Sequence, residues 1–168
     1  ASQLWGGKGE LPWSWGVLEE QAVGALEQWI TARNGRKFFA LYSNIFPHHP
    51  YYCPLEKKPF RDDTWLGRYR NALFYADQNI GHLADWLTQQ KLIDRTIIVL
   101  VGDHGETVST YPCGHGLAMT PEEMKVPMVI TNPTLFPSGQ QSRIFTNHLD
   151  VSPTLLGLLH VPAPKAWL

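Results

Sequence analysis

The feature that most constrains this sequence is an apolar run, Thr96 to Val101, which leads directly into the segment GDHGE at residues 102–106. A continuous apolar and β-branched run of this length predicts a central strand covered on both faces. Ligand-binding residues of open α/β sheets gather at the carboxyl ends of such strands. We therefore expect Asp103 and His104 to lie at one edge of a sheet, where both can reach a shared ligand.

Asp103 and His104 offer a carboxylate oxygen and an imidazole nitrogen from adjacent positions, and the glycines beside them let the backbone bend. Oxygen and imidazole together suit Zn²⁺ or Mn²⁺, whereas a site dominated by carboxylates suits Ca²⁺. The alternative interpretation is structural: Asp103 would cap a helix and His104 would be held by a hydrogen bond. Taken alone, the pair is a weak signal for a metal site.

Two further histidine positions strengthen the hypothesis. His115 lies between two glycines downstream, and His48 and His49 follow a short apolar run, Phe38 to Ser43, that we interpret as a buried strand. A lone histidine is usually structural, but several imidazoles at strand ends can bind metals and oxyanions. We expect the three histidine-bearing loops to converge at one edge of one sheet.

The remaining pattern predicts an α/β fold with a mixed, largely parallel sheet flanked by helices. Apolar residues recur at helical spacing in two long segments, and further apolar runs predict strands. The expected elements are a helix at 17–31 ended by Asn34-Gly35, a loop at 44–63, a helix from Asp63 or Thr64 to Gln90, a strand at 126–131, a short strand at 143–146 and a helix at 149–159 with Asp150 or Ser152 near its start.

Composition excludes two classes of partner. The chain has 168 residues, of which 43% are hydrophobic and 17% charged, as in a globular domain. Its formal net charge of -1, without a run of Lys or Arg, predicts no nucleic-acid binding. No apolar run approaches the roughly 20 residues that a membrane-spanning helix needs. The sequence lacks a signal peptide and an initiator Met, so we expect it to be a piece of a longer protein.

Four segments resemble the sulfatase and alkaline-phosphatase superfamily, in the order in which that superfamily carries them. They are FFALYSNIFPHHPYYCP, YRNALFYADQNIGHLADWLTQQKLIDRTIIVLVGDHGE, GHGLAMTPEEMKVPMVI and TNHLDVSPTLLGLL. The resemblance covers roughly residues 15–162 and implies an alkaline-phosphatase-like fold. Residues 1–168 would then form a single partial domain, the C-terminal part of a sulfatase-like catalytic domain.

The resemblance also implies roles for individual residues. Asp103 and His104 match the metal-binding pair, for a divalent ion that could be Ca, Mn or Zn. His48 matches a histidine that touches the oxygens of the substrate's sulfate or phosphate, and His115 matches a second such contact or the acid for the leaving group. The implied substrate is a small-molecule, glycan or lipid ester, and the implied location is extracytoplasmic or periplasmic, with a membrane anchor in the parent protein left open. We interpret three other matching residues as structural: Tyr75, Asp77 and Asp150.

The sequence departs from the family pattern at the nucleophile. Sulfatases carry it in a Cys/Ser-x-Pro-x-Arg motif that precedes the histidine loop, and this chain has no such motif. Cys53 follows the histidine loop and lacks the motif, so we reject it as the nucleophile. Whether Cys53 and Cys113 pair as a disulfide or remain unrelated thiols is open. We expect this chain alone to bind metal weakly and to turn over little or nothing.

Three functions remain open at this point, beside an α/β domain with incidental histidines. The first is hydrolysis of sulfate or phosphate esters. The second is transfer of phosphoethanolamine or phosphoglycerol, because the spacing between the GHG segment and Lys125 is shorter than in many sulfatases. The third is a sulfatase-like domain that binds or senses without catalysis.

Overall fold

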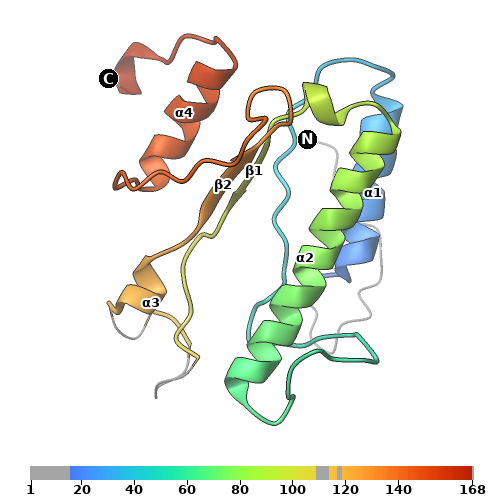
Figure 1. The fold of residues 1–168 in the computed structure, drawn as a ribbon, viewed down its shortest axis with the longest axis vertical. Coiled ribbons are helices and arrows are strands. Elements are labelled where there is room, and N and C mark those ends of the chain that lie inside the picture. Colours follow the sequence, from blue (N-terminus) through green and yellow to red (C-terminus); the bar gives the residue numbers. More distant parts are fainter. Residues whose placement is uncertain (1–15, 109–113, 117–118, 168) are drawn as a thin grey trace.

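The computed structural model describes residues 16–108, 114–116 and 119–167. In Figure 1 the two strands lie between α4 on one side and the adjacent helices α1 and α2 on the other. The elements, in chain order, are α1 (Glu19–Ala32), α2 (Trp65–Gln89), η1 (Ile93–Arg95), β1 (Ile98–Val101), α3 (Pro121–Met124), β2 (Met128–Thr131), η2 (His148–Asp150), α4 (Val151–Leu158) and η3 (Lys165–Trp167).

The long helix α2 is the centre of the packing. It begins at Thr64, whose hydroxyl accepts a hydrogen bond from the backbone N–H of Gly67 at 3.0 Å, as the sequence predicted for the cap. Positions three and four residues apart on one face of α2 are buried. That face packs against the loop at 44–63, and together they form the hydrophobic core. The core residues are Phe46, Tyr51, Cys53, Ala72, Tyr75 and Ala76.

The first turn of α1 holds the start of this loop. The carboxylate of Glu19, buried in the interior, accepts hydrogen bonds from the backbone N–H groups of Ile45 and Phe46 at 3.1 and 3.2 Å. The hydroxyl of Tyr75 on α2 accepts from the Glu19 backbone N–H and donates to the carboxylate of Glu20. Tyr75 is therefore structural, as expected, and the loop that carries His48 is anchored to both helices.

The sheet differs from the expected largely parallel one. In the described part of the chain it consists of β1 and β2, which pair antiparallel with Ile98 opposite Thr131 and Val101 opposite Met128. Parallel pairing needs a crossover connection, whereas the chain after β1 turns back through α3 and returns directly. The α/β class is confirmed.

Two predicted strands are wrong, and β1 is less covered than predicted. The segments 38–43 and 143–146 form no strand in the described structure; Phe39 and Phe145 are 75% and 101% exposed. An apolar β-branched or aromatic run becomes a strand only where a neighbouring strand pairs with it. The residues of β1 are half-buried or exposed, because its faces are only partly covered in the described part of the chain.

The 3-10 helix η2, which leads directly into α4, begins at a cap built by two residues. Asn147 accepts from the backbone N–H of Leu149 at 2.8 Å, and Asp150 accepts from the N–H of Asn147 at 2.7 Å. This reciprocal capping box is the structural role expected of Asp150. Asp77 lies on the exposed face of α2. Among the residues described here, no helix combines the length and apolarity needed to cross a bilayer.

Candidate functional site

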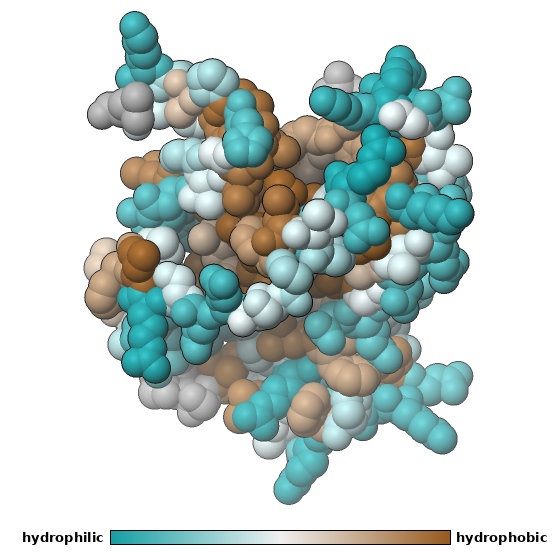
Figure 2. Space-filling view, turned by 45° about the horizontal axis from the view of Figure 1, so that its top comes forward, coloured by the Kyte–Doolittle hydropathy of each residue, from teal (hydrophilic) through white to brown (hydrophobic). Residues whose placement is uncertain are grey.

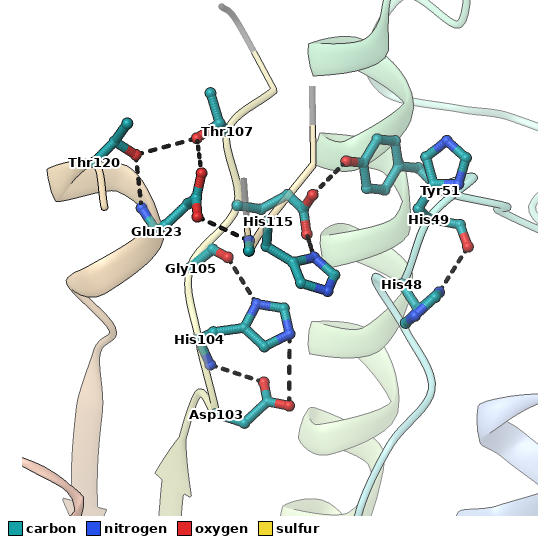
Figure 3. A network of polar contacts seen from close by, with 12 residues as sticks. His48, His49, Tyr51, Asp103, His104, Gly105, Thr107, His115, Thr120 and Glu123 are labelled. Atoms are coloured by element: carbon teal, nitrogen blue, oxygen red, sulfur yellow. Dashed lines mark hydrogen bonds and ion pairs between the residues drawn. The ribbon is translucent and has the colours of Figure 1, made fainter. Parts of the chain in front are cut away.

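The predicted metal pair lies where β1 ends. The Asp103 carboxylate accepts a hydrogen bond from the His104 backbone N–H at 2.9 Å, which turns its second oxygen toward the His104 ring. This oxygen, Oδ2, lies 3.7 Å from Nε2 of His104, and the Asp103 side chain is 90% exposed. Figure 3 shows the carboxylate and the ring edge facing one another. Both ligand atoms are therefore available to one exogenous group.

The backbone after His104 is pressed against α3. The N–H of Gly105 donates to the carbonyl of Glu123 at 2.7 Å. A Cβ atom at position 105 would lie 1.8 Å from the carbonyl oxygen of Glu122, which is closer than real Cβ atoms come to any atom. Only glycine fits at this point of the GDHGE segment. The requirement comes from the neighbouring helix and not from a turn.

A short backbone bridge brings His115 back to His104. Thr107 and Gly114 exchange two backbone hydrogen bonds, at 3.0 and 2.8 Å, so the chain folds back on itself. The rings of His104 and His115 consequently stack with their centroids 3.9 Å apart and 33° between their planes. Nδ1 of His115 lies 3.0 Å from the carboxylate of Glu106.

The upstream histidine loop reaches the same place. The ring centroids of His48 and His115 lie 6.3 Å apart. Tyr51, buried in the core, donates its hydroxyl to the second oxygen of Glu106 at 2.9 Å. Glu106 thus connects the loop of His48 to the loop of His115. The three histidine-bearing loops converge, as the sequence predicted.

All three imidazoles are held through the same ring nitrogen. Nδ1 of His48, His104 and His115 lies 2.7, 2.8 and 3.0 Å from the carbonyl of His49, the carbonyl of Gly105 and the carboxylate of Glu106, respectively. Oxygens of these kinds accept hydrogen bonds, so each neutral ring carries its proton on Nδ1. Nε2 then keeps its lone pair, and an oxygen behind the ring fixes its direction, as it does for histidine ligands of metals.

The donor atoms fit a divalent cation. Zinc bonds of 2.0–2.2 Å in a tetrahedral site place neighbouring ligand atoms about 3.3–3.6 Å apart. The 3.7 Å between Asp103 Oδ2 and His104 Nε2 is close to this spacing. Ligand atoms of His104, Glu106 and His115 also lie within 4.8 Å of one another. A set of imidazole nitrogens and carboxylate oxygens suits Zn²⁺ or Mn²⁺ better than Ca²⁺.

Burial affects ionisable groups both near the site and at Cys53. The Glu106 side chain is 7% exposed, and burial, together with the charge of Glu106, raises the pKa of the nearby Tyr69. Cys53 is buried and free, and burial raises the pKa of its thiol, so a thiolate is disfavoured. This agrees with rejecting Cys53 as a nucleophile. Cys113 lies outside the described residues.

Sequence reasoning did not single out three residues that shape the site. Glu106 carried a signal, since it lies within the same GDHGE segment as the metal pair. Glu123 completes the pattern Thr-x-x-Glu with Thr120, a recognised helix-start signature. Tyr51 carried no signal, because its role depends on the contact that its hydroxyl makes with a residue remote in sequence.

The chain is similar to known proteins in both sequence and structure. A sequence model of the sulfatase family, described as "Sulfatase", matches residues 2–161. A solved structure of a protein in the alkaline phosphatase superfamily from Vibrio parahaemolyticus superimposes with a TM-score of 0.69 at 26% identity, covering 92% of this chain and 36% of that one.

Curated relatives include both hydrolases and a transferase. The uncharacterized sulfatase YidJ of Escherichia coli K12 is 25% identical over 88% of this chain and 36% of its own length. A choline-sulfatase of Rhizobium meliloti is 32% identical over 54% of this chain and 18% of its own. The phosphatidylethanolamine transferase Mcr-2 of Escherichia coli is 27% identical over 83% of this chain and 30% of its own. The chain thus spans roughly a third or less of each of these relatives.

Proposed function

The chain belongs to the sulfatase family, and from that premise we propose that it supplies part of the catalytic site of a metal-dependent hydrolase of sulfate or phosphate esters. The observation that carries the proposal is the convergence of His48, His104 and His115, each held through Nδ1, beside the exposed carboxylate of Asp103. Such a group of donors can hold a cation and an anion side by side.

In this proposal Asp103 and His104 are the metal ligands. The exposed carboxylate oxygen and the lone pair on Nε2 face one another across a gap of 3.7 Å, and His104 is oriented by its Nδ1 hydrogen bond to Gly105. A divalent ion of the Zn²⁺ or Mn²⁺ type, when bound, supplies Lewis-acid stabilisation of charge on the ester group. The metal could equally recruit Glu106 and His115, whose ligand atoms lie near that of His104.

His48 and His115 contact the ester oxygens. When protonated, each imidazole can donate a charge-assisted hydrogen bond from Nε2 to a sulfate or phosphate oxygen. The carboxylate of Glu106 stabilises the cationic form of His115 and holds its ring in place. One of the two histidines can also pass its proton to the leaving alcohol, and a positioned acid of this kind contributes about 10²–10⁴ in rate.

A transferase is the second candidate, favoured by one specific observation. Mcr-2, named a phosphatidylethanolamine transferase, matches 83% of this chain, nearly as much as the 88% matched by the sulfatase YidJ. Displacement at phosphorus uses the same cation and the same histidine contacts as displacement at sulfur. The substrate class would then be a lipid carrying a phospho-alcohol group.

The test is metal-dependent release of nitrophenol from nitrophenyl sulfate and from nitrophenyl phosphate, in the protein in which the chain occurs. We expect Asp103→Asn and His104→Ala to lose more than about 90% of the rate, since each removes a ligand. Asp77→Asn is the matched control, because it removes a carboxylate from the exposed face of α2. An Asp103→Asn protein that keeps its rate would overturn the assignment. Turnover of phosphatidylethanolamine without turnover of either nitrophenyl ester would favour the transferase.

A further inference from the structure

We infer that α3 holds the chain segments of His104 and His115 together, and that Glu123 is the positioning residue that keeps His115 beside His104. The inference rests on the proposed metal site in the form in which His104, Glu106 and His115 hold the ion, since their ligand atoms lie within 4.8 Å of one another. It adds a residue that needs to touch neither the ion nor the substrate. It concerns the two loops that leave and re-enter the site around residues 105 and 116.

Glu123 binds three backbone or side-chain groups of these loops at once. Its carbonyl oxygen accepts from the N–H of Gly105 at 2.7 Å, directly after His104. Its carboxylate accepts from the N–H of Gly116 at 2.9 Å, directly after His115, and from the hydroxyl of Thr107 at 3.3 Å. One residue therefore fixes the chain next to both stacked imidazoles (Figure 3).

The local sequence explains why Glu123 faces inward. Thr120 caps α3 by accepting from the backbone N–H of Glu123 at 3.3 Å, and Pro121 occupies the first turn, where its missing N–H is not needed. The Thr120 hydroxyl also lies 3.2 Å from that of Thr107. Glu123 is consequently half-buried against the site, whereas the adjacent Glu122 is exposed.

His115 is held from both sides of its position in the chain. Before it, Gly114 is bound to Thr107 by two backbone hydrogen bonds; after it, Gly116 is bound to the Glu123 carboxylate. A hydrogen bond from a backbone N–H to a carboxylate is charge-assisted and stronger than a neutral one. Without Glu123 the segment after His115 loses this anchor, and the 3.9 Å stack with His104 loses one of its supports.

The experiment measures Zn²⁺ affinity of the 168-residue chain by calorimetry. Glu123→Ala is expected to weaken Zn²⁺ binding by about tenfold or more, the usual cost of losing a residue that orients a ligand. Glu122→Ala removes the same charge from the neighbouring position and is expected to leave the affinity within about twofold. Equal weakening by both variants would show a general charge effect and overturn the inference.

A double-mutant cycle tests whether Glu123 acts through His115. In a His115→Ala background, Glu123→Ala is expected to cause no further loss of Zn²⁺ affinity, because the residue that it positions is gone. Independent, additive losses would contradict the positioning role. Glu123→Gln retains an acceptor oxygen for the Gly116 N–H and is expected to recover most of the affinity.

Thermal melting, followed by circular dichroism, separates loss of the site from loss of the fold. If Glu123→Ala does not fold, Glu123→Asp replaces it, since the shorter carboxylate keeps the charge but cannot span Gly116 and Thr107 together. If the wild-type chain binds no Zn²⁺, the proposed metal site fails, and positioning is judged by cross-relaxation between the His104 and His115 rings in NMR. That signal should persist in Glu122→Ala and weaken in Glu123→Ala. An unchanged signal in both variants would refute the positioning role of Glu123.

Discussion

At the scale of single residues, the buried Glu19 makes stability depend on pH. Burial raises the pKa of its carboxyl above the ordinary value, although the N–H groups of Phe46 and Ile45 partly oppose the shift. The folded state therefore holds this proton more tightly than the unfolded state. Its contribution to stability is fully present below the unfolded pKa and is lost as pH rises through the folded pKa.

Glu19→Gln, which keeps an acceptor for the two N–H groups but cannot ionise, is expected to remove that pH dependence. The melting temperature of the wild-type chain should fall more steeply than that of Glu19→Gln as pH rises from about 4 to about 8. Glu56→Gln, at an exposed position of the loop, serves as the control and should follow the wild type. Parallel curves for wild type and Glu19→Gln would refute the prediction.

Two buried tyrosine hydroxyls should respond oppositely to removal. Tyr51→Phe leaves the buried Glu106 oxygen without its donor, and we expect a loss of about 1–3 kcal/mol in the free energy of unfolding. The Tyr42 hydroxyl is buried and has no hydrogen-bond partner among the described residues, so Tyr42→Phe should be neutral or stabilising. Urea denaturation of both variants measures this. A neutral Tyr51→Phe would mean that Glu106 does not depend on that donor.

At the scale of elements, two glycine substitutions distinguish the close contact of Gly105 with α3 from the general preference of helices for alanine over glycine. Gly105→Ala would place a methyl group 1.8 Å from the backbone of α3, so the site has to open. We expect weaker Zn²⁺ binding and a lower melting temperature. At Gly81 in α2 an added methyl group would meet open space, and Gly81→Ala should raise stability by about 0.5–1 kcal/mol. Calorimetry and thermal melting of the pair test this, and wild-type Zn²⁺ affinity in Gly105→Ala would contradict it.

The elements that could be predicted from sequence are those stabilised by local interactions. Helices α1 and α2 and the cap at Thr64 follow from periodicity and from the residues at each start. Segment 38–43 has a strand's composition, but pairing depends on a neighbour, and none pairs with it in the described residues. The direction of the β1–β2 pair could not be read either, because it depends on how the chain returns through α3.

The site, like the fold, was predictable where it depends on local sequence. The strand end at Val101 and the flanking glycines identified Asp103, His104 and His115 as neighbours, because chain geometry after a strand is constrained. His48 lies beside them although the strand expected before it, at 38–43, does not form. Their second partners were not predictable. The contacts of Glu106 with Tyr51, and of Glu123 with Gly116, arise from folded packing, to which hydrophobic periodicity gives no guide.

At the scale of the whole molecule, buried side chains are concentrated on one side. The hydrophobic core joins α2 to the loop at 44–63, while α4 has no buried residue. Figure 2 shows hydrophobic side chains gathered in a hollow of the surface. Several large apolar residues elsewhere in the chain are strongly exposed: Leu41 at 88%, Ile144 at 79%, Phe145 at 101% and Leu149 at 84%.

Large apolar side chains exposed to this degree favour association with other molecules. We expect the 168-residue chain, studied alone, to bind a hydrophobic dye and to self-associate as its concentration rises, which light scattering after size-exclusion chromatography measures. Leu41→Lys combined with Phe145→Lys should reduce association without lowering the melting temperature, because both side chains are already exposed. Leu87→Lys, at a position 2% exposed in α2, should instead unfold the chain. A wild-type chain that stays monomeric and binds no dye would show that this apolar surface is already covered.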